Sequence, residues 1–192
     1  MNIAMITTAE MLSLAIFLIV SIGLVIFSWP SFRKPGGHGF YRFFVFECIL
    51  GLAVLNVPFW FSSPFSPAQL FSWLLLIIAG YLVISAVILL KRRGKAGSAR
   101  QEDALLGFEK TTALVTEGLY SYIRHPMYSS LLFLAWGIFF KHPVLVTGCI
   151  ALVASAFLLA TARADEAECL RFFGPPYAEY MQRTKRFIPF IF

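Results

Sequence analysis

Long apolar runs separated by short polar segments dominate the hydrophobicity pattern of this chain. A membrane-spanning helix needs roughly 20 apolar residues to cross about 30 Å of hydrocarbon. Four runs reach that length, at residues 11–29, 43–61, 70–90 and 143–162. A fifth run, at 127–140, is shorter, and Lys141-His142-Pro143 separates it from the last run by a tight turn. The pattern therefore predicts an all-α, polytopic membrane helix bundle of about five transmembrane helices, ending in a C-terminal helical hairpin.

The composition agrees with this interpretation. Of the 192 residues, 59% are hydrophobic and 14% are charged, whereas soluble domains carry about 25% charged residues. This balance excludes an ordinary water-soluble domain and a disordered chain. The first run is preceded by no basic residue and is longer than the apolar core of a secretory signal peptide, so we expect it to be a membrane span. We treat residues 1–192 as one membrane domain, with a three-span part (1–93) and a C-terminal part (94–192).

The basic residues predict the orientation of the bundle. If there are five spans, 15 of the 16 Lys and Arg residues fall on one face, and only Lys141 falls on the other. By the positive-inside rule, the N-terminus is then outside and the C-terminus cytoplasmic. Basic residues that flank spans bind anionic headgroups, and no nucleic-acid recognition module accompanies the net charge of +6. The three cysteines are widely spaced, so no disulfide framework or metal site is expected.

Two polar stretches border the predicted hairpin at its cytoplasmic end. The first contains Arg124-His125-Pro126, in which Pro126 suits the first turn of a helix. Arg124 and His125 then lie at the positive end of that helix, where free backbone N–H groups favour an anion such as a carboxylate. The alternative is that Arg124 reaches the lipid headgroups while His125 merely caps the helix.

The second stretch, residues 163–189, follows the last span and begins with the acids Asp165, Glu166 and Glu168. Asp165 and Glu168 are one helical turn apart, while Glu166 points elsewhere. A carboxylate here could bind an ammonium or sulfonium group or act as a base. The alternative is a solvated helix face paired with Arg163 or Arg171.

Gly174-Pro175-Pro176 must end that helix, and a short helix over residues 178–186 is expected to follow. Its Tyr177, Tyr180 and Met181 side could cover the hairpin as a lid or lie on the membrane surface. Within the second span, Glu47 is an intramembrane charge and therefore a functional candidate, unless it pairs with Arg42 or Arg33. Residues 36–39 are expected to form a flexible loop.

Together these two stretches resemble the integral-membrane methyltransferases of the isoprenylcysteine carboxyl methyltransferase and phospholipid methyltransferase type. The resemblance covers roughly residues 114–189. The matching residues are Leu114, Val115, Gly118, Tyr120, Arg124, His125, Pro126, Tyr128, Glu166, Phe173, Gly174, Tyr177, Tyr180 and Pro189. Relatives often have two adjacent Glu residues after the last span, where this chain has Asp165-Glu166, so the role of Asp165 is left open.

The resemblance implies methyl transfer from S-adenosylmethionine to a lipidic acceptor, either a prenylcysteine-type carboxylate or a phospholipid amine. It places Tyr120, His125, Pro126, Tyr128, Glu166 and Tyr177 in the cofactor pocket. His125 would bind the carboxylate of the methionine moiety and Glu166 its ammonium, with Arg124 and Glu166 as the catalytic pair. No Rossmann motif is present, in keeping with this family.

Two other classes of protein remain as alternatives. A membrane sterol-type reductase using NADPH shares a similar C-terminal half but is typically longer. A non-catalytic scaffold or small transporter is disfavoured because transporters usually need polar groups near mid-bilayer.

Overall fold

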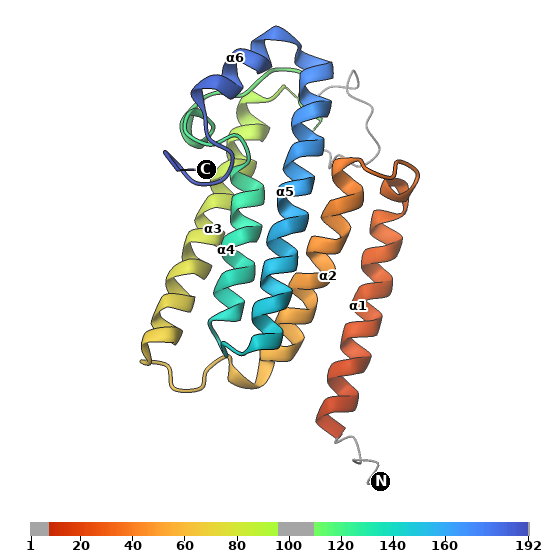
Figure 1. Cartoon of the computed structure of the whole chain (residues 1–192), viewed down its shortest axis with the longest axis vertical. Helices are drawn as coiled ribbons and strands as arrows, with labels where there is room; N and C mark the ends of the chain where they lie inside the picture. Colours follow the sequence, from red (N-terminus) through yellow and green to blue (C-terminus); the bar gives the residue numbers. More distant parts are fainter. Residues whose placement is uncertain (1–7, 96–109, 192) are drawn as a thin grey trace.

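The computed structural model describes residues 8–95 and 110–191, and Figure 1 shows them as a bundle of helices running up and down. The long apolar helices are α1 (Thr8–Phe32), α2 (His38–Asn56), α3 (Pro67–Arg93) and α5 (Leu145–Phe173), and each is long and apolar enough to cross a membrane. The shorter α4 (Pro126–Phe139) pairs with α5, and α6 (Pro175–Arg183) follows. The predicted all-α membrane bundle with its C-terminal hairpin is confirmed.

Local sequence explains where these helices begin and end. The 3₁₀ turn η1 (Val57–Phe59) follows α2, which ends at Asn56, five residues before the predicted boundary, because Pro58 has no backbone N–H to continue the α-helical hydrogen bonds. Ser66 caps α3 by accepting a hydrogen bond from the Gln69 N–H, and Pro67 occupies the first turn.

The helix of the last span is longer than its apolar run predicts. α5 continues to Phe173, so Asp165, Glu166 and Glu168 lie on the spanning helix itself. It ends at Gly174, whose φ of +65° and ψ of −141° suit glycine alone. The predicted short helix at 178–186 is displaced: α6 begins at Pro175 and ends at Arg183. Thr184, the residue after it, is extended, and Lys185 pairs with Ile123 in the segment before α4.

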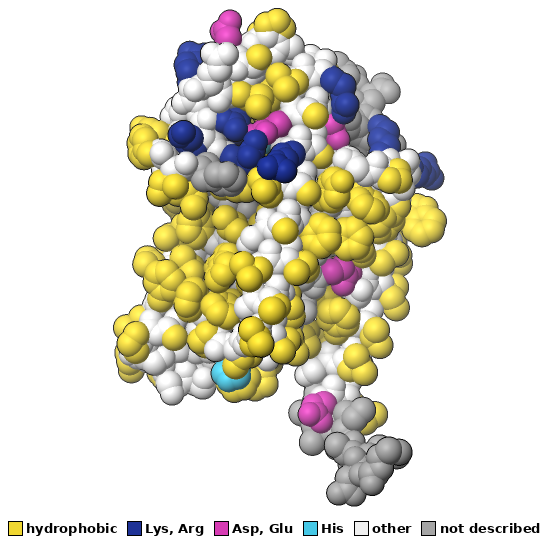
Figure 2. Space-filling view, viewed as in Figure 1, with side chains coloured by type: hydrophobic (Ala, Val, Ile, Leu, Met, Phe, Trp, Pro, Cys, Tyr) yellow, Lys and Arg dark blue, Asp and Glu magenta, His cyan; other side chains and the backbone are white. Residues whose placement is uncertain are grey.

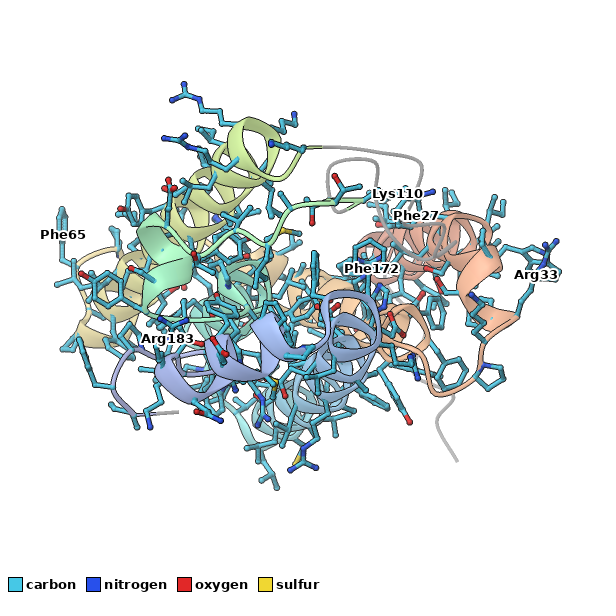
Figure 3. The ribbon with its side chains drawn as sticks, turned by 90° about the horizontal axis from the view of Figure 1, so that it is seen from above. Phe27, Arg33, Phe65, Lys110, Phe172 and Arg183 are labelled. Carbon is cyan, nitrogen blue, oxygen red and sulfur yellow. The ribbon has the colours of Figure 1, made fainter. Side chains whose placement is uncertain are left out.

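The helices pack in an order that leaves α1 at the edge. α2 packs against α5, α4 against both α3 and α5, and α1 against α2. Seen from above, Arg183, the last residue of α6, and Arg33, just after α1, lie on opposite sides of the bundle (Figure 3). Charged side chains gather at the α6 end, above a broad apolar belt (Figure 2). This segregation is that of an integral membrane protein. Arg100, one of the basic residues of the predicted loop, lies outside the described residues.

Candidate active site

The segment that enters α4 is held in place by the C-terminal tail. The N–H groups of Arg124 and His125 donate to the carbonyls of Lys185 and Arg186, at 2.8 and 3.2 Å. Ser129, one turn into α4, donates its hydroxyl to the Phe187 carbonyl at 2.8 Å. The tail therefore fixes the direction in which the Arg124 and His125 side chains leave the backbone.

Glu166 is the centre of a buried ion-pair cluster. Its carboxylate accepts from Arg124 Nε at 2.9 Å, and from Arg186 Nε and Nη2 at 3.1 and 2.8 Å. Arg124 also donates to the carbonyls of Met181 and Thr184. Glu166 is only 4% exposed, so an unpaired carboxylate here would be strongly disfavoured. Three chain segments, the start of α4, α5 and the tail, are thus tied to one side chain.

His125 lies between two carboxylates. Its Nε2 is 3.3 Å from Glu166 Oε1, and its Nδ1 is 3.5 Å from Asp165 Oδ2. Burial alone lowers the pKa of His125, but the hydrogen bonds and negative charges of Asp165 and Glu166 outweigh it, so the pKa is raised above its ordinary value. The two carboxylates therefore favour the charged form of His125.

Beside this cluster is a cavity of about 100 Å³ that opens between α3, α4, α5 and α6. Its lining combines aromatic rings, apolar side chains and three charged groups. These residues are Leu90, Thr111, Leu114, Val115, Tyr120, Arg124, His125, Pro126, Met127, Tyr128, Asp165, Cys169, Phe173, Tyr177 and Tyr180. Apolar walls with a few convergent polar groups are typical of small-molecule sites.

The helix α6 forms one wall of this cavity. Tyr177 and Tyr180 are buried against Cys169 and Phe173 of α5. The Tyr180 hydroxyl donates to the Tyr120 carbonyl at 2.6 Å, joining α6 to the 3₁₀ turn η2 (Gly118–Ser121) before α4. Burial raises the pKa of both tyrosines, so their hydroxyls stay protonated. Of the two arrangements considered from the sequence, α6 adopts the one in which it folds over the hairpin.

The structure brings most of the predicted site residues to one cavity. They are Tyr120, Arg124, His125, Pro126, Tyr128 and Tyr177. Glu166 is the exception: its carboxylate faces Arg124 and Arg186 rather than the cavity, and the acid that lines the cavity is Asp165. Arg124 and Glu166 bind one another. The alternative in which Arg124 reaches the lipid headgroups is therefore wrong, and so is the pairing of Glu166 with Arg163 or Arg171.

Two polar positions on α2 differ from the sequence expectation. His38 was expected in a flexible loop but is buried as the first residue of α2, beside Glu168 of α5. Its burial follows from tertiary packing, which no local signal in the sequence encodes. Glu47 accepts hydrogen bonds from Ser21 of α1 at 2.9 and 3.0 Å, so an ion pair with Arg33 or Arg42 does not explain it.

Comparison with known proteins identifies this arrangement. A family model described as phospholipid methyltransferase matches residues 68–175, more than half of the chain. The chain belongs to the phospholipid methyltransferase family. The match runs from α3 through Arg124, His125 and the acids of α5 to the start of α6, so it contains most of the cavity lining, except Tyr177 and Tyr180, and most of the ion-pair cluster.

Two curated relatives are similar to this family member. One is protein-S-isoprenylcysteine O-methyltransferase of Schizosaccharomyces pombe, 27% identical over 177 residues, which cover 85% of this chain and 72% of the relative. The other is protein-S-isoprenylcysteine O-methyltransferase B of Arabidopsis thaliana, 35% identical over 88 residues, or 43% of each chain. No solved structure matches the chain significantly.

Proposed function

We propose that the chain transfers a methyl group from S-adenosylmethionine to the carboxylate of a prenylcysteine-type lipidic acceptor. The observation that carries the proposal is the cavity beside Arg124 and His125, which joins aromatic walls to groups of both charges. The names of the two relatives support an O-methylated, lipidated acceptor.

The residues of the cavity fit the parts of this cofactor. The rings of Tyr120, Tyr128 and Tyr177 suit stacking with adenine. Asp165 suits the ammonium of the methionine moiety, and the charged imidazole of His125 suits its carboxylate. We assign the ammonium to Asp165 rather than to Glu166, because Glu166 is already bound by two arginines.

Entry of the cofactor requires α6 to move. Ligand pockets usually enclose about 300–1,000 Å³, whereas this cavity, which α6 bounds on one side, has a volume of about 100 Å³. Two polar contacts of α6 must then open: the Tyr180 hydroxyl with the Tyr120 carbonyl, and Arg124 with the Met181 carbonyl. In this proposal α6 is a lid that admits the cofactor and then excludes water.

The charges of the site favour a carboxylate acceptor. When bound, S-adenosylmethionine would supply a methyl group on a positively charged sulfur. A carboxylate oxygen would attack the methyl carbon with its own lone pair, the carbon–sulfur bond would break with its electrons left on sulfur, and S-adenosylhomocysteine would leave; no proton is lost. The chain has only to bind, orient and desolvate the reactants. Arg124 and His125 place two cationic groups on the wall of the cavity, where they suit an anionic acceptor.

A phospholipid amine is the second candidate, and the description of the matching family favours it. An amine must lose a proton before or during its attack. Asp165, the acid that lines the cavity, is then the group that accepts the proton.

The membrane orientation supports a cytoplasmic site. Basic residues gather at the α6 end of the bundle (Figure 2). The positive-inside rule then places that end and the C-terminus in the cytoplasm, with the N-terminus outside. The cofactor enters from the cytoplasm and the acceptor from the bilayer.

The test is transfer of a labelled methyl group by the purified protein in lipid nanodiscs. One arm offers an N-acetylated S-prenylcysteine and the other offers phosphatidylethanolamine. Base-labile label on the prenylcysteine, absent when its carboxylate is already esterified, supports the first candidate. Base-stable label in the phospholipid headgroup supports the second instead. A folded protein that binds no cofactor and labels neither acceptor contradicts both.

A further inference from the structure

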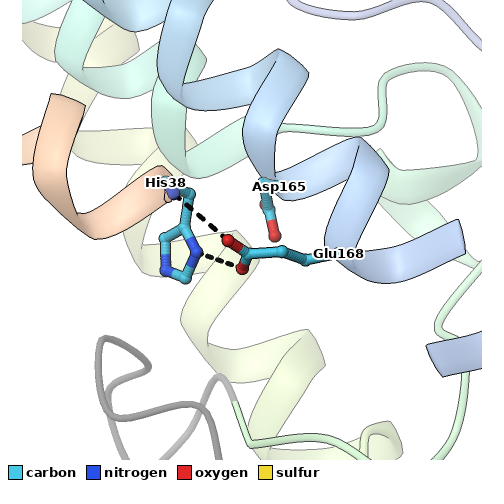
Figure 4. A group of neighbouring side chains, drawn as sticks. All are labelled: His38, Asp165 and Glu168. Atoms are coloured by element: carbon cyan, nitrogen blue, oxygen red, sulfur yellow. Dashed lines mark hydrogen bonds and ion pairs between the residues drawn. The ribbon is translucent and has the colours of Figure 1, made fainter. Parts of the chain in front are cut away.

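His38 and Glu168 join the N-terminal half of the bundle to the helix that carries the proposed cofactor site. The imidazole Nδ1 of His38 is 2.5 Å from Glu168 Oε2, and the backbone N–H of His38 donates to Glu168 Oε1 at 3.3 Å (Figure 4). His38 is 1% exposed. One carboxylate of α5 thus binds both the side chain and the backbone of the residue that begins α2.

The backbone contact also caps α2. Gly37, the residue before the helix, has no side chain to satisfy the first N–H groups, and Glu168 supplies the missing acceptor. A carboxylate at this position is further stabilised by the helix dipole. The position of Glu168 is therefore determined by α2 as well as by its own helix.

Asp165 lies one turn before Glu168 on the same face of α5. The ligating atoms of His38, Asp165 and Glu168 are all within 4.8 Å of one another (Figure 4). Two carboxylates at this spacing on one helix repel each other. A distance of 2.5 Å between Nδ1 and Oε2 is that of a hydrogen bond and leaves no room for a metal ion between them.

The two ring nitrogens of His38 have different surroundings. Nδ1 faces Glu168, whereas Nε2 points away from both carboxylates (Figure 4) and has no hydrogen-bond partner within the described part of the chain. The ring of His38 therefore interacts with the two carboxylates through its Nδ1–H group. It draws Glu168 toward α2 and away from Asp165.

We propose that His38 is a positioning residue for the cofactor site: by binding Glu168, it keeps the Asp165 carboxylate directed into the cavity, where it receives the ammonium of the cofactor. This inference rests on the proposed function, and it assigns a role to α2, which contributes no residue to the lining of the cavity. His38 touches neither reactant and acts only through the two acids of α5.

The test compares two ligands and two substitutions. The ligands are S-adenosylhomocysteine, which has the amino acid moiety, and 5′-methylthioadenosine, which lacks it. His38→Leu removes the Nδ1 donor, whereas His38→Asn keeps a donor at nearly the same position. His38→Leu should weaken the binding of S-adenosylhomocysteine about tenfold and leave the affinity for methylthioadenosine unchanged. His38→Asn should bind S-adenosylhomocysteine within about threefold of the wild type.

A double-mutant cycle and a distant control complete the design. In an Asp165→Asn background, His38→Leu should weaken the binding of S-adenosylhomocysteine no further, because the carboxylate that His38 positions has already been removed. His142→Asn, in the turn at the opposite end of the bundle where His142 stacks on Phe59, should leave both affinities unchanged.

Each result separates the two hypotheses. If the wild-type protein binds neither ligand, the proposed function fails. If the wild type binds both and His38→Leu weakens them equally, or weakens only methylthioadenosine, then His38 has a general structural role and the inference is overturned. Additive effects of His38→Leu and Asp165→Asn overturn it as well.

Discussion

Replacing Glu166 by glutamine removes one negative charge from the centre of the ion-pair cluster while keeping the shape of the side chain. The carboxylate of Glu166 binds Arg124, Arg186 and His125, and it is almost completely buried. A glutamine keeps one oxygen acceptor but turns an N–H₂ group toward these donors. The cationic groups then stay in place without the charge that compensates them.

The expected loss of stability follows from this burial. Breaking a buried ion pair by neutralising one partner costs about 3–5 kcal/mol, since it leaves an uncompensated charge away from water. For a chain of this length, 1 kcal/mol corresponds to about 2–4 °C in Tm. A loss of 3 kcal/mol, the lower end of the range, therefore lowers Tm by about 6–12 °C.

The assay is thermal unfolding in detergent, followed by tryptophan fluorescence, with Glu117→Gln as the matched control. Glu117 pairs with Arg93 at 3.3 Å, but both side chains are 63% exposed, and exposed pairs contribute about 0–1 kcal/mol. Glu117→Gln should therefore shift Tm by less than about 4 °C. Equal shifts for the two variants would refute the reasoning that burial makes the Glu166 cluster a major source of stability.

Three further predictions concern the site and the packing around it. The pKa of His125 is raised in the folded protein, so its charged form contributes full stability below pH 6.5, and this contribution is lost as the pH rises through the pKa of the folded state. Tm should therefore fall toward alkaline pH, and it should fall less steeply in His125→Gln. Gly137→Leu should cost about 1–3 kcal/mol of stability, since a Cβ there would lie 2.9 Å from Leu76 Cδ2 where α3 and α4 approach. Gly23→Leu, with nothing within 4 Å of its Cβ, should not lower Tm. Gly174→Ala should cost about 1–3 kcal/mol through its positive φ alone, and calorimetry should show weaker S-adenosylhomocysteine binding because α6 starts at this residue.

The sequence predicts the membrane bundle because composition alone determines which segments can span hydrocarbon. It also predicts the hairpin, since the short connection Lys141-His142-Pro143 keeps α4 and α5 side by side. The length of α5 is not predictable in this way. Its charged last turns are stabilised by partners from α2 and from the tail, at His38 and Arg186, which are far away in the sequence.

The sequence predicts which residues form the site, but it does not predict which way their side chains point. Helical periodicity separates Glu166 from Asp165 and Glu168, yet it does not say which face meets the cavity. That depends on the Arg186 side chain and on the extended tail beside Ile123. The boundaries of α6 depend on the same tail, because residues that pair with the segment before α4 cannot continue a helix.

The central claim is that the cavity between α4, α5 and α6 binds S-adenosylmethionine with its ammonium on Asp165. The most direct measurement is an experimental structure of the protein with S-adenosylhomocysteine. The account predicts density for the ligand in the cavity, with adenine against the tyrosine rings and the amino nitrogen within hydrogen-bond distance of Asp165. Density elsewhere, or an amino nitrogen bound by Glu166 after its arginines have separated from it, would contradict the account.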